Sequence, residues 1–193
     1  MVAALVVVPA DPAGDGGRGD VEQLVAVLTE PDRGPAGATT RWTSQTLTYR
    51  LELDGYPLWY IAEVHAAFAW GAAVSGLHVV PTAGPADVIV RRGPGSGAQL
   101  VAALHTDGSL ASVDVSLGCC RRRPLWEDIL QSFGPLGDRA DQRSVFSQDL
   151  TRELPSCFDA AVIRTLYSLP VAALTASVAP AGAQHVAAAC SDR

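Results

Sequence analysis

The stretch of sequence that decides the fold is Leu125-Trp-Glu-Asp-Ile-Leu-Gln-Ser-Phe-Gly-Pro-Leu-Gly-Asp138. It predicts a helix over about 125–133 that ends at Gly134, because the proline that follows cannot continue a helix. Glu127 and Gln131 are four residues apart and therefore lie on one face of this helix, with Asp128 about a quarter turn away. The stretch thus predicts a short helix that presents two carboxylates and an amide.

The elements predicted around this helix point to an α+β fold. β-Branched and aromatic residues alternate over 46–52, which predicts a strand, and apolar residues at helical spacing predict a long helix over 56–73. The remaining predicted elements are a helix over 21–29, strands over 77–80, 87–91, 99–105 and 110–117, and a helix over 158–169. We expect a mixed, twisted sheet of four to five strands, packed by the long N-terminal helix and the helix at 125–133, with helices at the C-terminal end.

Several segments resemble parts of matrixin-like metzincin proteases. The front half of such domains is similar to Arg41-Trp42, Leu47–Arg50, Ala66–Trp70, Leu77–Val80 and Ala86–Val90, and their closing helix is similar to Phe158–Tyr167. These proteases carry HExxHxxGxxH on the helix after the last strand. There the first two His bind zinc, the Glu is the general base, and the Gly lets the chain turn back to a third ligand. The resemblance implies a zincin-like fold over about residues 21–170.

The active-site helix is degenerate when it is compared with that signature. When Gly134 is aligned with the glycine of the signature, Glu127 takes the place of the first zinc ligand and Gln131 that of the second. Asp128 takes the place of the general base. The position of the third ligand falls on Gly137. None of the protease's metal-binding histidines is therefore present on this helix.

A bacterial zincin-like family of unknown function has a similar degenerate pattern. Its members carry Glu-Glu-x-Thr-Gln-Ala-Leu-Gly in place of HExxH, then Asn-Asp, then Ser-x-Phe. This chain is similar to them in Glu127–Gly134, Asp138 and Ser144-Val-Phe146. It departs from them with Asp128 in place of the second Glu and Leu130 in place of Thr, so roles that depend on those side chains do not carry over.

The residue types predict a site without zinc and without any other cofactor. Glutamine is a poor zinc ligand, and Phe146 stands where the resemblance expects a methionine beneath the metal. One interpretation is a retained cleft of Glu127, Gln131, Asp138 and Phe146, in which the Glu–Gln pair binds a polar ligand or a hard cation such as calcium. In the other interpretation, which we favour, the carboxylates stabilise the helix N-terminus and Gln131 bonds to a neighbouring loop.

Composition and charge exclude some functions. The chain of 193 residues has 14 basic residues, all of them Arg, against 20 acidic ones, and a net charge of -6. This charge argues against nucleic-acid or anionic-membrane binding as the main activity. No apolar run is long enough to span a membrane. Residues 1–20 are predicted to be a flexible leader or a signal-peptide remnant, and 171–193 an Ala-rich tail or helix cut by Pro180 and Gly182.

The four cysteines suggest an oxidising compartment, either periplasmic or secreted. Neighbouring cysteines seldom bond to each other, so the sequence favours a bridge from Cys119 or Cys120 to Cys157. Free buried thiols are the alternative. The chain has no CxxC spacing, which argues against a structural zinc site of the usual kind.

Two functions fit these observations. The first is a catalytically inactive zincin-like module, a pseudoprotease, that binds a protein or envelope component in the former substrate cleft. This cleft lies beside the edge strand, where substrates of active relatives pair by strand addition. The second is a hydrolase that uses Glu127 and Asp128 as general acid and base, with or without a metal other than zinc. The missing ligands favour the first.

Overall fold

The computed structural model describes residues 18–29, 39–95, 98–134, 144–146, 153–171, 173 and 175–190. These residues form five helices and five strands, which confirms the predicted α+β class. The elements are α1 (Arg18–Thr29), β1 (Thr46–Glu52), α2 (Leu58–Ser75), β2 (His78–Pro81), β3 (Val88–Arg92), β4 (Ala98–Leu104), β5 (Leu110–Leu117), α3 (Arg122–Gln131), α4 (Cys157–Ser168) and α5 (Thr175–Cys190).

The five strands form one sheet in the order β2-β1-β3-β5-β4. The neighbours from β2 to β5 run parallel, and β4 runs antiparallel to β5. The reversal comes from a tight hairpin in which the amide of His105 donates to the carbonyl of Ser109, with Gly108 at positive φ. β4 is therefore an edge strand that has β5 as its one neighbour among the described residues.

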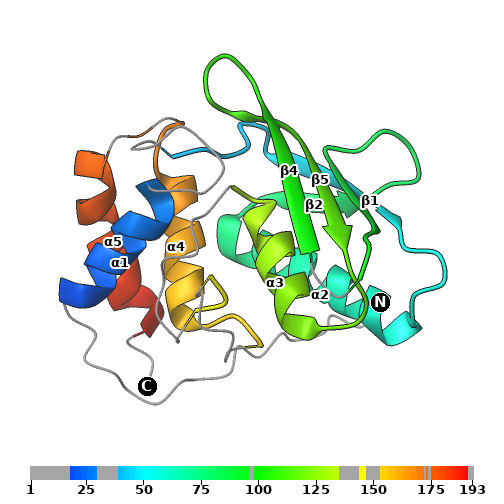
Figure 1. Ribbon diagram of the computed structural model, residues 1–193. Helices are drawn as coiled ribbons and strands as arrows, with labels where there is room; N and C mark the ends of the chain where they lie inside the picture. Colours follow the sequence, from blue (N-terminus) through cyan, green and yellow to red (C-terminus); the bar gives the residue numbers. More distant parts are fainter. Residues whose placement is uncertain are drawn as a thin grey trace.

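Helices α2 and α3 cover one face of the sheet, the face to which the aligned buried residues Tyr49, Val88 and Val113 point. Tyr49 of β1 stacks on Phe68 of α2 with 3.9 Å between the ring centroids. α3 packs beside α2 and also contacts β4 and β5. Figure 1 shows the resulting layers: the sheet, then α2 and α3, then a group formed by α1, α4 and α5.

The third layer includes the C-terminal segment, which was predicted as an Ala-rich tail or helix. α5 packs on α1 and α4, and it continues through Pro180 and Gly182 instead of ending there. Gly182 allows close packing of α5 on α1, since a Cβ atom there would lie 2.6 Å from Leu24 Cδ2 and would force that side chain to shift. Val178 and Val186 of α5 belong to the same core as α1 and α4. The described part of 171–193 is thus a packed helix. No helix in the described ranges combines the length and hydropathy needed to cross a bilayer.

The disulfides differ from the predicted pairing. Cys157, the first residue of α4, is bonded to Cys190, the last residue of α5, with 5.4 Å between their Cα atoms. Cys119 and Cys120 are bonded to each other in the turn between β5 and α3. The expected bridge from this turn to Cys157 is therefore wrong, and so is the alternative of free thiols. The packing of the helices explains the observed pairing. α4 packs against α5, which brings Cys157 to Cys190, whereas the turn with Cys119 and Cys120 is held at the start of α2 by the hydroxyl of Tyr60.

Candidate functional site

Helix α3 carries the residues that take the place of the protease signature. It begins at Arg122, three residues earlier than predicted, because Pro124 lies in the first turn, where a missing N–H is tolerated. Leu125, Ile129 and Leu130 are fully buried and form the side of α3 that packs into the core. The helix is thus held by its apolar residues, and the polar ones are left on the remaining face.

The three candidate residues of α3 separate into an outer pair and an inner acid. Glu127 and Gln131 are half-buried on one face, as their spacing predicts. Asp128 is only 8% exposed and lies near Tyr60 of α2. Burial, the neighbouring Tyr56 and the negative charge of Asp128, in that order, raise the pKa of Tyr60 to about 12. Both acids make polar contacts within the protein. Asp128 therefore belongs to the α2–α3 interface, and Glu127 and Gln131 remain as the polar face.

A further acid, Glu63 of α2, was missed by sequence reasoning. One oxygen of its carboxylate accepts a hydrogen bond from Trp126 Nε1 at 3.1 Å, and the other lies 3.1 Å from an Nη atom of Arg122. Glu63 thereby fastens the first two turns of α3 to α2. The signal in the sequence was a single acid within an apolar helix, which does not reveal which partners it meets.

The C-terminal end of α3 is held by side chains from distant segments. Trp42 Nε1 donates to the carbonyl of Ser132 at 2.8 Å, and the hydroxyl of Tyr167 donates to the carbonyl of Phe133 at 2.7 Å. Gly134 follows without a positive φ, and a Cβ atom there would lie 2.6 Å from the carbonyl oxygen of Thr40. This glycine is required by close packing. These two hydrogen bonds satisfy the carbonyls of Ser132 and Phe133, the residues that directly follow α3.

The segment Ser144–Phe146 is anchored by a buried acid. The hydroxyl of Ser144 donates to Asp159 of α4, and Asp159 also accepts from the amides of Val145 and Ser156 at 3.4 and 2.7 Å. Ser156 and Asp159 together form a capping box at the start of α4. Burial raises the pKa of Asp159 to about 6, against the effect of these hydrogen bonds. One acid therefore both caps α4 and orders the segment before it.

Of the four predicted cleft residues, the structure describes Glu127, Gln131 and Phe146. Phe146 is fully buried in the core, so it does not form a wall open to solvent. Asp138 lies outside the described residues. Among the described residues no group of three His, Cys, Asp or Glu side chains is placed to hold a metal ion. Nδ1 of His65 instead shares a hydrogen bond with the hydroxyl of Tyr49 at 2.6 Å, and burial lowers the pKa of His65, which favours the neutral ring.

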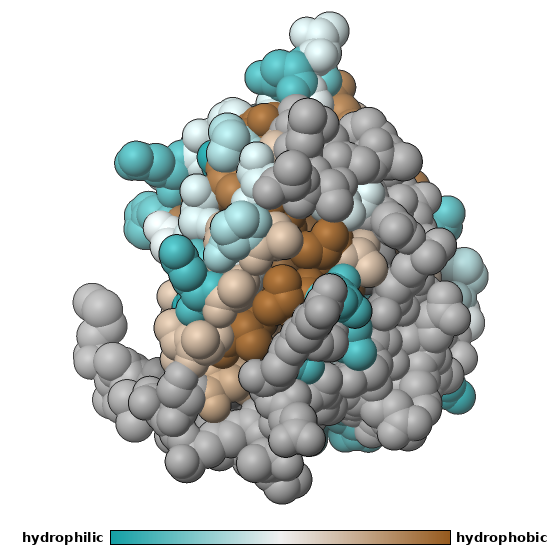
Figure 2. All heavy atoms as spheres, turned by 90° about the vertical axis from the view of Figure 1, so that its left-hand side faces the viewer, coloured by the Kyte–Doolittle hydropathy of each residue, from teal (hydrophilic) through white to brown (hydrophobic). Residues whose placement is uncertain are grey.

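Two other surfaces differ in character from this site. On the face that carries α1 and α5, Figure 2 shows an apolar area, and an open hollow of about 380 Å³ there is lined by Val21, Glu22, Val25 and Ala179. It offers one ionisable side chain and no set of converging polar groups. It therefore suggests no chemistry.

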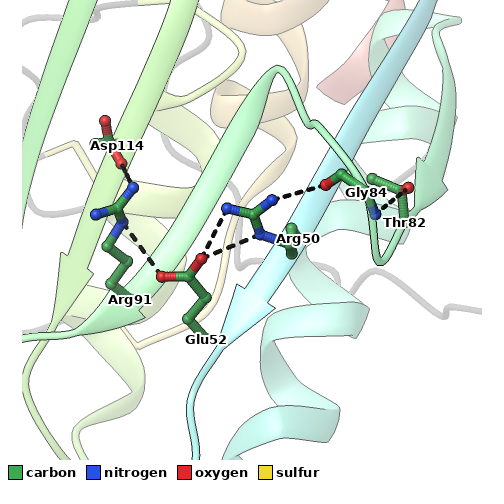
Figure 3. Close-up of polar contacts among 6 residues, drawn as sticks. All are labelled: Arg50, Glu52, Thr82, Gly84, Arg91 and Asp114. Atoms are coloured by element: carbon green, nitrogen blue, oxygen red, sulfur yellow. Dashed lines mark hydrogen bonds and ion pairs between the residues drawn. The ribbon is translucent and has the colours of Figure 1, made fainter.

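The second surface is the sheet face opposite α2 and α3, which carries a network of ion pairs (Figure 3). Glu52 lies 2.8 Å from Arg50 and 3.5 Å from Arg91, and Arg91 also lies 3.1 Å from Asp114. Arg50 donates further to the carbonyl of Gly84 at 2.8 Å. Two cations and two anions neutralise each other in this network. These four residues therefore present no patch of one sign for a charged ligand.

Comparison with known proteins adds no assignment to this geometry. No protein-family model matches the sequence, and no curated protein is significantly similar to it.

Proposed function

We propose that this chain is a catalytically inactive zincin-like module that binds an extended segment of a protein or envelope component between β4 and α3. The observation that carries the proposal is that α3, the helix after the last strand, presents Glu127 and Gln131 on its polar face at the spacing of two zinc ligands. A carboxylate and a neutral amide at these positions do not support zinc hydrolysis. They do provide one acceptor and one group that both donates and accepts.

The edge strand supports a binding role. β4 contacts α3, and its sequence, Ala-Gln-Leu-Val-Ala-Ala-Leu, has no charged residue that would discourage pairing with another chain. Val101 is 58% exposed, and Leu104 is also exposed near the end of the strand. By register, Leu100 lies opposite the buried Val115 and points to the helix side, while Val101 points to the other face. An added strand would find backbone partners on β4 and apolar side chains on both faces.

The disulfide between Cys157 and Cys190 supports a periplasmic or secreted location for this module. Disulfides persist in oxidising compartments, and reducing conditions in a bacterial cytoplasm would open most of them. The envelope component proposed as a partner would be met in the same compartment.

The first test measures catalysis and metal content. The purified chain is expected to contain no stoichiometric metal by elemental analysis and to leave a fluorogenic peptide library uncleaved when zinc or calcium is added. Near-stoichiometric metal, or cleavage that Glu127→Ala abolishes, would instead support a hydrolase that uses Glu127 and Asp128.

The second test measures strand addition. Peptides selected from a displayed library of ten-residue sequences are resynthesised with N-methyl groups at alternate positions, which removes backbone donors from one edge. We expect binding to fall at least tenfold for one of the two methylation patterns and little for the other. Along β4, alternate residues direct their N–H away from β5, so Val101→Pro and Ala102→Pro form a matched pair. One is expected to weaken binding without changing stability, and the other to destabilise the strand. Equal binding by all of these peptides and variants contradicts strand addition.

A further inference from the structure

The disulfide between Cys119 and Cys120 does not hold two parts of the fold together. The bonded residues are neighbours in sequence, in the turn between β5 and α3. In the chain-entropy account, a disulfide stabilises a fold by restricting the unfolded chain, and the effect grows with the length of the closed loop. The bond between Cys157 and Cys190 joins residues 33 apart and ties α4 to α5. The bond between neighbours closes no such loop, so stability does not explain it.

The turn that carries this bond is open to solvent in part. Cys119 and Cys120 are half-buried, and they pack on one side against the core. Figure 1 shows the connection between β5 and α3 at one end of the sheet, beside the start of α2. Cys157 and Cys190 are half-buried as well, so exposure alone does not distinguish the two disulfides. The difference lies in the surroundings of the sulfur atoms.

The start of α3 favours a thiolate beside it. The N-cap residue is Arg121, directly after Cys120, and no side chain among the described residues caps this helix. Its first amides therefore have no side-chain acceptor, and together with the positive end of the helix they stabilise a neighbouring negative charge. Arg121 is exposed and adds a cation next to the sulfur atoms. Cys157 also lies at a helix start, but there the capping box of Ser156 and Asp159 already uses the first amides.

The acids of this region do not cancel that effect. Glu63 is paired with Arg122, so this pair adds no net charge at the turn. Glu127 and Asp128 lie in the second turn of α3, about 8–9 Å along the helix axis from its first residue. The first amides of α3 and the guanidinium of Arg121 are nearer to the cysteines in the chain. They are the groups that would stabilise a thiolate at the turn.

The turn does not depend on the disulfide to keep its place. The hydroxyl of Tyr56 donates to the carbonyl of Leu117 at 2.5 Å, and the hydroxyl of Tyr60 donates to that of Gly118 at 2.9 Å. These hydrogen bonds hold the end of β5 to the start of α2 whether or not the sulfur atoms are bonded. The two thiols would therefore stay side by side after reduction, ready to form the bond again.

We propose that Cys119 and Cys120 are a redox-active pair that accepts two electrons from a dithiol by thiol–disulfide exchange. A thiolate of the dithiol attacks Sγ of Cys119, the bond between the two cysteines breaks, and Cys120 leaves as the thiolate beside α3. The second thiol of the dithiol then attacks the mixed disulfide at the dithiol's own sulfur and releases Cys119. Two electrons and two protons pass to the pair, and the dithiol becomes a disulfide. This reaction is independent of the proposed strand addition at β4.

The test equilibrates the full oxidised chain with mixtures of reduced and oxidised dithiothreitol. Free thiols are trapped by alkylation after an acid quench and located by mass spectrometry of the peptides. We expect Cys119 and Cys120 to be half reduced at a ratio of reduced to oxidised reagent at least tenfold lower than Cys157 and Cys190, which serve as the internal control. The melting temperature should not change when the first pair alone is reduced. Reduced thioredoxin, used in parallel, distinguishes a protein dithiol from a small one, and reduction by either reagent supports the proposal.

Matched arginine variants test the surroundings of the pair. Arg121→Gln is expected to slow the reduction of Cys119 and Cys120 about threefold at pH 7, whereas Arg164→Gln, at an exposed position of α4, should leave the rate unchanged. The proposal is overturned if both disulfides are reduced at the same ratio, or if the reduced pair does not form its bond again in oxidised dithiothreitol. It is also overturned if the two arginine variants react equally fast, or if reducing the pair lowers the melting temperature, which would indicate a structural bond.

Discussion

The position of α3 depends on a contact between Gly71 of α2 and Phe133, and this contact can be tested by adding one methyl group. A Cβ atom at Gly71 would lie 2.4 Å from Cε2 and from Cζ of the fully buried Phe133 ring. Carbon atoms pack at about 3.5–4.0 Å, so the ring would have to move by roughly 1 Å or more. It cannot move freely, since its backbone carbonyl is held by Tyr167 and its ring also lies 6.3 Å from that of Phe68.

The magnitude follows from two opposing effects of Gly71→Ala. Overpacking a core costs about 1–3 kcal/mol. Replacing glycine by alanine within a helix contributes about 0.5–1 kcal/mol of stability. We therefore expect a net loss of about 1–2 kcal/mol in the free energy of unfolding. For a chain of this size that corresponds to a melting temperature lower by about 2–8 °C.

The assay is urea unfolding followed by circular dichroism, for Gly71→Ala alone and combined with Phe133→Leu. Leucine lacks the ring atoms that the new methyl group would meet. In the Phe133→Leu background the effect of Gly71→Ala on the free energy of unfolding is expected to change sign. There the substitution should stabilise the protein by about 0.5–1 kcal/mol. Ala73→Gly, at an exposed position of α2, measures the helix-propensity contribution directly. The reasoning is refuted if Gly71→Ala stabilises the parent protein, or if its cost is the same in the Phe133→Leu background as in the parent protein.

Three further predictions concern stability. Replacing Cys157 and Cys190 by serine should lower the free energy of unfolding by about 3–4 kcal/mol. This is the contribution expected from the entropy of closing a loop between residues 33 apart in sequence. The reduced parent protein is the control, and a loss below about 1 kcal/mol would contradict the prediction. Asp159 has its pKa raised to about 6 in the folded protein, so the folded state holds its proton more firmly than the unfolded state does. This contribution to stability is complete below about pH 4 and is lost as the pH rises through 6, by about 2–3 kcal/mol. Asp159→Asn should remove that slope in urea titrations between pH 4 and 7.5, and an unchanged slope would show that another group causes it. Tyr167→Phe removes the hydrogen bond to the carbonyl of Phe133 and should cost about 1–2 kcal/mol in the same assay; no measurable change would mean that water replaces the hydroxyl.

Much of the fold was predictable because its signals are local. Alternation over 46–52 predicted β1 with the bounds that the structure has. The predictions that failed relied on local residue preferences that tertiary packing overrides. Pro180 and Gly182 were expected to interrupt the C-terminal segment, yet α5 continues through both because its apolar side packs on α1 and α4.

The candidate site was predictable only in its outline. The spacing of Glu127 and Gln131 placed them on one face of a helix, since four residues make about one turn. The packing of α2 against α3 buries Asp128 near Tyr60. The same packing brings Glu63 to Trp126 and Arg122. Residue spacing within one helix carries no information about the neighbouring helix.

The sequence by itself determined the order and type of the elements and the residue types on α3, because periodicity and side-chain chemistry are properties of short segments. Only the tertiary structure decided which of those side chains are buried, that Cys157 bonds to Cys190, and that Asp159 orders Ser144. Cys157 and Cys190 are 33 residues apart in the chain. They meet only because burying apolar surface brings α4 and α5 together, and that gain depends on the whole core.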